Sequence, residues 1–145
     1  MRHPTLPEAD WRHETGLQRI MTALADDLGG PLAVGGAVRD SLLGEVVTDV
    51  DLATPLHPDA VVRRLEAADI KAVPTGIAHG TITAVADGKP YEVTTLRRDV
   101  ATDGRRATVA FADTWREDAE RRDFTINALY AHPESGEIFD YFDGL

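Results

Sequence analysis

The stretch TDVDLAT (residues 48–54) places two aspartates, Asp49 and Asp51, one residue apart in a segment that otherwise resembles a buried strand. Successive side chains of a strand point to opposite faces of a sheet, so Val50 and Leu52 share one face and both carboxylates share the other. Two like charges on one face repel each other, and burial would remove their hydration. A strand end dipping into solvent would also explain the pair, so the neighbouring sequence has to decide whether a cation is bound there.

The composition is that of an acidic globular chain of 145 residues, with 43% hydrophobic and 28% charged residues and a net charge of −10. The chain has no cysteine, which excludes disulfides and thiolate zinc sites. It has neither an apolar run of the roughly 20 residues that span a membrane nor a signal-peptide pattern, so we expect a cytoplasmic protein without a membrane partner.

Basic residues gather in one part of the chain. Residues 97–122 hold seven of the fifteen Lys and Arg against six acidic residues, whereas the remainder holds eight basic and nineteen acidic residues. This distribution predicts a local phosphate-binding site on an acidic body, and it argues against a broad nucleic-acid-binding surface.

The order of periodic segments predicts an α+β domain, with a mixed sheet of about five strands and helices mainly on one face. Residues 1–13 are expected to form a loose lead-in and residues 97–110 a charged loop. The expected helices are 14–28, 37–44, 58–69 and 113–130. The expected strands are PLAVGG (31–36), TDVDLAT (48–54), KAVPTG (71–76), HGTITAVA (79–86) and YEVTTL (91–96), followed by a last extended piece, GEIFDYF (136–142).

The stretch AVGGAVRD (33–40) predicts an anion site beside the two aspartates, because a strand that enters Gly-Gly and then a helix exposes backbone N–H groups. It is neither a P-loop nor a Rossmann fingerprint. Mg²⁺ prefers carboxylates, water and substrate phosphates, and phosphoryl transfer commonly uses two ions roughly 3.5–4 Å apart. Asp49 and Asp51 would start roughly 6.6 Å apart at Cα, which suits such a pair of ions.

Several motifs together resemble the catalytic head of the bacterial CCA-adding enzyme and poly(A) polymerase family, which belongs to the DNA polymerase β-like nucleotidyltransferases. The resemblance runs from about residue 30 to the last residue. It implies a catalytic head at residues 30–145 after a lead-in and helix at 1–29, and two Mg²⁺ ions held by Asp49 and Asp51. The motifs are LAVGGAVRDSLLG, TDVDLAT, PTGIAHGTIT, EVTTLRRD, DGRR and RRDFTINAL.

The resemblance also implies that the phosphates of the nucleotide contact Gly36 and Arg39 and that Arg122 contacts the nucleotide. Arg122 falls inside an apolar stripe of the expected helix 113–130, where a guanidinium is costly unless an anion receives it. A surface helix with scattered charges is the alternative. The predicted apolar stripe comprises Trp115, Ala119, Ile126 and Leu129. The predicted nucleotide-binding residues are Gly35, Gly36, Arg39, Arg121, Arg122, Asp123 and Asn127.

Three further segments allow two interpretations each. Glu92 is a candidate third catalytic carboxylate or a base for the attacking hydroxyl, but it could be an exposed strand residue. For His79 we favour an anchoring role in a turn over metal ligation. DGRR (103–106) is expected as a mobile loop over the site or as a solvated turn.

In the family that the chain resembles, an ED-x-x-R motif in a neck domain after the head selects the base. EDAER (117–121) spells this motif, but it overlaps the helix that enters RRDFTINAL, so we interpret the match as coincidental. The chain stops at FDGL, where the family continues, so we expect an isolated head without neck, body and tail. Such a head would be weakly active or inactive alone, and the full protein would bind tRNA mainly through the absent domains.

The predicted function is metal-dependent transfer of CMP and AMP, from CTP and ATP, to the 3′ end of tRNA. A poly(A) polymerase and a CC-only or A-only adding enzyme share the head motifs and remain alternatives. A non-catalytic nucleotide-binding or interaction module is the alternative from a different class.

Overall fold

The computed structural model describes residues 5–25, 30–47, 49–76, 80–100, 108–112, 114–120 and 129–140. Its helices are η1 (Asp10–His13, a 3-10 helix), α1 (Thr15–Leu24), α2 (Gly36–Leu42), α3 (Pro58–Ala67) and α4 (Trp115–Glu120). Its strands are β1 (Leu32–Val34), β2 (Asp51–Thr54), β3 (Lys71–Gly76), β4 (Thr81–Ala86), β5 (Lys89–Thr95), β6 (Arg97–Val100), β7 (Thr108–Phe111), β8 (Leu129–Ala131) and β9 (Ile138–Asp140). No helix in these ranges is long and apolar enough to cross a membrane.

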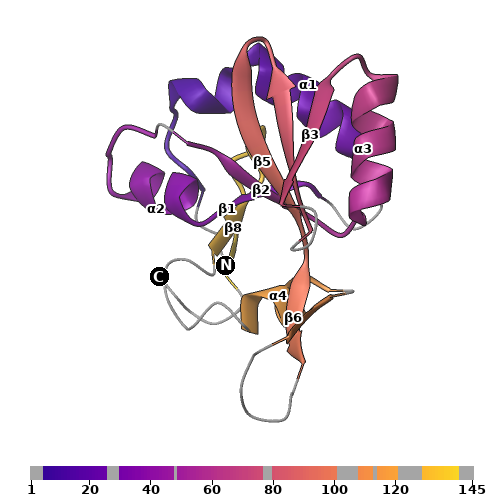
Figure 1. Cartoon of the computed structure of the whole chain (residues 1–145). Coiled ribbons are helices and arrows are strands. Elements are labelled where there is room, and N and C mark those ends of the chain that lie inside the picture. Colours follow the sequence, from indigo (N-terminus) through magenta and orange to yellow (C-terminus); the bar gives the residue numbers. More distant parts are fainter. Residues whose placement is uncertain are drawn as a thin grey trace.

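Seven strands form one mixed sheet in the order β3-β4-β5-β2-β1-β8-β9, and β6 and β7 form a separate hairpin (Figure 1). Strand β2 runs parallel to β5, and the other neighbours in the sheet are antiparallel. The predicted α+β class and mixed sheet are therefore confirmed. The sheet has seven strands instead of about five because β8 and β9 extend it beyond β1.

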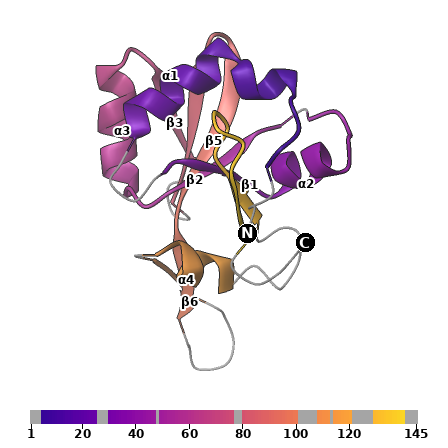
Figure 2. The same cartoon turned by 180° about the vertical axis from the view of Figure 1, so that it is seen from behind.

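Three helices cover one face of the sheet, as predicted, and build the larger part of the core. Figures 1 and 2 show α1 and α3 together on one side of the strands. The apolar side of α1, which includes Leu17, Ile20 and Leu24, is fully buried, and it packs in one cluster with α2, α3 and the inward residues of the sheet. Alternation along β4 buries Ile82 and leaves Thr83 half-buried on the other face.

Helix α4 packs on the opposite face, over one end of the sheet. Trp115 and Ala119 join a second apolar cluster with β1, Ala53 of β2 and Tyr130 of β8. The Trp115 and Tyr130 rings meet edge to face, with centroids 5.3 Å apart. Because α4 occupies only this end, the same face remains open over the start of β2 and the middle of β5, where Asp51 and Glu92 are exposed.

The predicted helix 113–130 is wrong at its C-terminal end. Leu129 and Tyr130 lie in β8, which pairs with β1 on one side and β9 on the other, and residues 121–128 lie outside the described ranges. Both residues are fully buried in the sheet. The helical spacing of Leu129 suggested a helix face, but Leu129 pairs with β9 and Tyr130 pairs with both β1 and β9. This tertiary pairing overrides local periodicity.

Residues 97–110 were predicted to be a charged loop, but their two ends pair as β6 and β7, with Arg97 opposite Phe111. Residues 101–107 are not described. The β-branched and aromatic residues Thr108, Val109 and Phe111 favour a strand once a partner is present. The backbone N–H of Ala112 donates to the carbonyl of Leu96 at 2.7 Å and closes the base of this hairpin.

The segment before α1 is packed, so the expected loose lead-in is also wrong for its described part. Arg12 is 4% exposed, and its guanidinium donates to the carbonyls of Leu6, Pro7, Pro133 and Glu134. A buried guanidinium is tolerated here because backbone carbonyls satisfy its N–H groups. Besides Arg12, two separate apolar residues, Leu6 and Trp11, attach the segment to the main core. The sequence showed no periodicity there because these attachments do not form a regular apolar stripe.

Candidate active site

A row of residues crosses the sheet at the predicted site. The strand pairings place Thr83 opposite Glu92, Glu92 opposite Asp51, Asp51 opposite Val34, and Val34 opposite Tyr130. Side chains directly opposite each other in a sheet project from the same face. The row therefore begins with polar groups over β4, β5 and β2, and it ends under α4 with apolar and aromatic groups.

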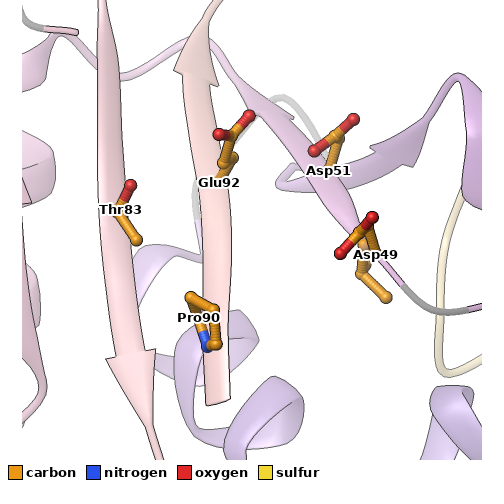
Figure 3. A pocket seen from close by; sticks show the side chains of 6 residues that line it. Asp49, Asp51, Thr83, Pro90 and Glu92 are labelled. Carbon is orange, nitrogen blue, oxygen red and sulfur yellow. The ribbon is translucent and has the colours of Figure 1, made fainter. Parts of the chain in front are cut away.

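Asp49 and Asp51 line one pocket with a volume of about 490 Å³ (Figure 3). The rest of its lining is Val50, Thr83, Pro90 and Glu92. Asp49, Asp51 and Glu92 are exposed, and Figure 3 shows their carboxylates on the same side of β2 and β5. The structure thus brings together the three residues predicted as catalytic, although Asp49 and Asp51 lie just before and at the start of β2 and Glu92 lies in β5, about 40 positions further along the sequence.

The electrostatics of the pocket suit a cation. Its described lining carries three carboxylates and no basic side chain, which makes the local potential negative. No group of three or more His, Asp or Glu in the described parts of the chain could hold a metal ion by itself. An exposed carboxylate pair without a closed protein cage fits Mg²⁺, which retains waters and binds substrate phosphates in its remaining positions.

The predicted phosphate-binding turn lies next to the aspartates. Gly35 directly follows Val34, the residue of β1 that pairs with Asp51. Gly35 has φ +71° and ψ −127°, a conformation that favours glycine, and it caps the start of α2. Gly36 opens α2. Arg39, one turn further on, is 42% exposed, and its Nε donates to Asp40 Oδ1 at 3.1 Å.

Four predicted nucleotide contacts, Arg121, Arg122, Asp123 and Asn127, lie outside the described residues, as do His79 and the segment 103–106. Their roles remain predictions. The helix that directly precedes them, α4, packs on the face of the sheet that carries the carboxylates.

One residue of the EDAER segment, Asp118, is buried and hydrogen-bonded in the interior. Asp118 is 1% exposed, and it accepts hydrogen bonds from the Tyr130 hydroxyl at 2.5 Å and from the Arg97 backbone N–H at 2.8 Å. These bonds connect α4 to β8 and β6. A carboxylate held in this way does not present its oxygens to a base, which supports the interpretation of this motif match as coincidental.

Thr83 and Pro90 line the pocket, although neither was among the predicted site residues. Both lie on the same face as Glu92, Thr83 through its cross-strand pairing and Pro90 two residues before Glu92 in β5. The alternation of Thr81, Ile82, Thr83 and Ala84 gave a signal for a half-polar strand. It could not show which strand would be its neighbour.

A model of the poly A polymerase head domain matches residues 32–145. The chain belongs to this family. The predicted resemblance is thereby confirmed, and the matched part of the head domain contains all of the described lining of the pocket. This is a family of nucleotidyltransferases, which generally depend on metal ions.

Relatives and solved structures agree on this family. The head domain is 42% identical to the mitochondrial CCA tRNA nucleotidyltransferase 1 of Mus musculus, over 95% of this chain and 32% of that protein. It is also 42% identical to the CCA-adding enzyme of Leuconostoc citreum, over 100% of this chain and 34% of that protein. The crystal structure of the Bacillus stearothermophilus CCA-adding enzyme in complex with CTP superposes with a TM-score of 0.71 and 38% identity, covering 90% of this chain and 31% of that one.

A second structure, a tRNA nucleotidyltransferase complexed with a primer tRNA and an incoming ATP analog, superposes with a TM-score of 0.56 and 30% identity. The match covers 78% of this chain and 31% of that chain. The head domain thus spans about a third of the length of the relatives that it matches.

Proposed function

We propose that this chain is the catalytic head of a tRNA CCA-adding enzyme, which transfers CMP and AMP from CTP and ATP to the 3′ end of tRNA. The observation that carries the proposal is the exposed pair Asp49 and Asp51, which share one pocket with Glu92 beside a Gly-Gly turn. The relatives at 42% identity are named for CCA addition, which favours this reaction over other nucleotidyl transfers.

Asp49 and Asp51 would hold two Mg²⁺ ions between their carboxylates and the triphosphate. When bound, such ions neutralise phosphate charge and lower the pKa of the attacking hydroxyl. Two observations make the site suitable for Mg²⁺. Asp49 and Asp51 offer hard oxygen ligands on one exposed face, and the described lining of their pocket includes no basic side chain.

The remaining groups position the substrates. Backbone N–H groups at Gly35 and Gly36, with the guanidinium of Arg39, would receive the phosphates of the nucleotide. Arg121 and Arg122 would add positive charge, and Asp123 and Asn127 would hold the ribose or orient Arg122.

Glu92 would accept a hydrogen bond from the attacking 3′-hydroxyl of the RNA and hold it toward the α-phosphorus. In phosphoryl transfer, positioning and charge neutralisation carry most of the rate enhancement.

Most of the binding energy for tRNA would come from protein outside these 145 residues. RNA affinity depends on basic side chains that meet phosphates, and the formal net charge here is −10. We accordingly assign residues 30–145 the chemical step and assign these residues little of the tRNA recognition.

The experiment that tests the function uses the full translation product of the gene, a tRNA that lacks its CCA end, Mg²⁺, and CTP and ATP separately and together. Addition of two C residues and then one A is expected. A run of A from ATP alone would indicate a poly(A) polymerase, and addition of only C or only A would indicate a partial activity. No transfer to any RNA would favour a non-catalytic nucleotide-binding module.

A further inference from the structure

In its described lining, the pocket extends to one side of the aspartates. From β2 it reaches across β5 to β4, through Glu92, Pro90 and Thr83, and its lining does not include Gly35 or Gly36 (Figure 3). In the sheet order β4-β5-β2-β1, the Gly-Gly turn follows β1 and therefore lies on the opposite side of Asp51. The two carboxylates thus separate a glycine turn from a polar pocket.

This arrangement assigns the two sides to the two substrates. In nucleotidyl transfer, the attacking oxygen and the departing pyrophosphate lie roughly in line, on opposite sides of the phosphorus. If the glycine turn receives the phosphates, as proposed above, the attacking hydroxyl approaches from the β5–β4 side. The pocket over β4 and β5 is then available to the RNA acceptor.

The lining of that side matches a ribose. Glu92 offers carboxylate oxygens that accept hydrogen bonds from sugar hydroxyls, and the Pro90 ring offers an apolar surface for the sugar ring. The half-buried Thr83 adds a hydroxyl, whose oxygen lies 2.7 Å from the Thr75 hydroxyl oxygen of β3. A hydroxyl has one donor and two acceptor sites, so this bond orients Thr83 and leaves capacity for a ligand.

We propose that Thr83, with Glu92 and Pro90, forms the subsite for the ribose of the 3′-terminal acceptor nucleotide, and that the Thr83 hydroxyl contacts the 2′-hydroxyl. The proposal rests on the proposed function. It makes Thr83 a residue that distinguishes an RNA end from a DNA end, because a 2′-deoxy terminus lacks the group that Thr83 binds.

The test uses the full translation product and two tRNA acceptors that differ only in whether the last nucleotide carries a 2′-hydroxyl. Thr83→Val removes the hydroxyl and keeps the side-chain shape and the preference for a strand. We expect the KM for the ribo-terminated tRNA to rise about 3- to 10-fold, the size of one neutral hydrogen bond, while the KM for CTP stays unchanged. The preference of wild type for the ribo-terminated acceptor should disappear, and Thr83→Ser should restore it.

Thr75→Val is the matched control. It breaks the same Thr75–Thr83 hydrogen bond but leaves the Thr83 hydroxyl in the pocket, and Thr75 is not among the lining residues. Equal effects of Thr75→Val and Thr83→Val on the acceptor would reduce Thr83 to a structural role and overturn the proposal.

A rise in the KM for CTP instead of tRNA would also overturn the subsite, as would an unchanged acceptor preference in Thr83→Val. These results differ from a failure of the proposed function, in which wild type itself transfers no nucleotide to either tRNA.

Discussion

Tyr91 and Glu92 are consecutive residues of β5, yet they belong to different parts of the protein. Tyr91 points into the helix-covered face, is 1% exposed and donates its hydroxyl hydrogen to Glu14 at 2.6 Å. Glu92 points to the open face and lines the acidic pocket. One strand therefore contributes one residue to the core and the next residue to the candidate active site.

The same division applies to the whole sheet. On the helix-covered face, Leu52, Ile82 and Val93 are at most 1% exposed and contact the helical layer through one apolar cluster. On the open face, Asp51, Thr83 and Glu92 lie opposite one another and remain accessible. Substitutions on the first face should change stability, and substitutions on the second should change activity.

The largest expected effect is on the open face. Asp49→Ala and Asp51→Ala should each reduce nucleotide transfer about 100-fold or more, because each removes a proposed principal ligand for charge-neutralising ions. The free energy of unfolding should change little, since both side chains are exposed and neither belongs to the apolar core. Transfer assays and urea unfolding of the same preparations measure both quantities. If both variants keep more than about a tenth of the activity, the metal assignment is wrong.

The neighbouring Leu52→Ala tests the covered face. It should lower the free energy of unfolding by about 2–5 kcal/mol, because it removes a buried side chain and leaves a cavity under the helices. Urea unfolding followed by circular dichroism measures this change. If Leu52→Ala lowers the free energy of unfolding less than Asp51→Ala does, the division between the two faces is contradicted.

Tyr91→Phe should have a smaller and pH-dependent effect. Burial, together with the hydrogen bond to the Glu14 carboxylate, raises the pKa of the Tyr91 hydroxyl above its ordinary value. The folded state therefore holds this proton more tightly than the unfolded state. The corresponding stability is fully present below about pH 10 and is lost as the pH rises from there toward the folded pKa.

Near neutral pH the variant should lose about 1–2 kcal/mol with the hydrogen bond, and its stability should fall less steeply than that of wild type between about pH 8 and about pH 10.5. The urea midpoints of wild type and Tyr91→Phe at both pH values measure this difference. If the stabilities of the two proteins decline in parallel, the prediction is contradicted. Activity near neutral pH should change little, because Tyr91 faces away from the pocket.

The smallest effect is expected at the edge of the covered face. Arg19 of α1 contacts Asp87 of the β4–β5 turn at 3.0 Å, and both side chains are more than a third exposed. Asp87→Asn keeps a residue type that tolerates the positive φ of 52° and removes the charge. The free energy of unfolding should change by less than about 1 kcal/mol, and less still at high salt. A larger loss of stability in thermal melts would mean that this ion pair contributes substantially to the packing of α1 against the sheet.

The sequence predicted local features well wherever one segment carried the whole signal. The alternation of Asp49, Val50, Asp51 and Leu52 predicted which side chains would share a face, and the structure exposes both aspartates and buries Val50 and Leu52. It failed where a distant partner decided the outcome. Leu129 and Tyr130 were predicted to be helical, but they lie in β8, which pairs with β1 and β9. Arg12 showed no pattern because its partners are backbone carbonyls scattered along the chain.

By itself, the sequence determined the α+β class, the strand that carries the aspartates, the glycine turn before α2 and the acidic balance of the chain. These follow from periodicity, residue chemistry and spacing, which act over a few neighbouring residues. Only the tertiary structure decided that β5 lies parallel to β2, so that Glu92 joins Asp51, and that β4 brings Thr83 to the same pocket. Strand order and register arise from pairing between distant segments, and each choice brings different side chains to one face.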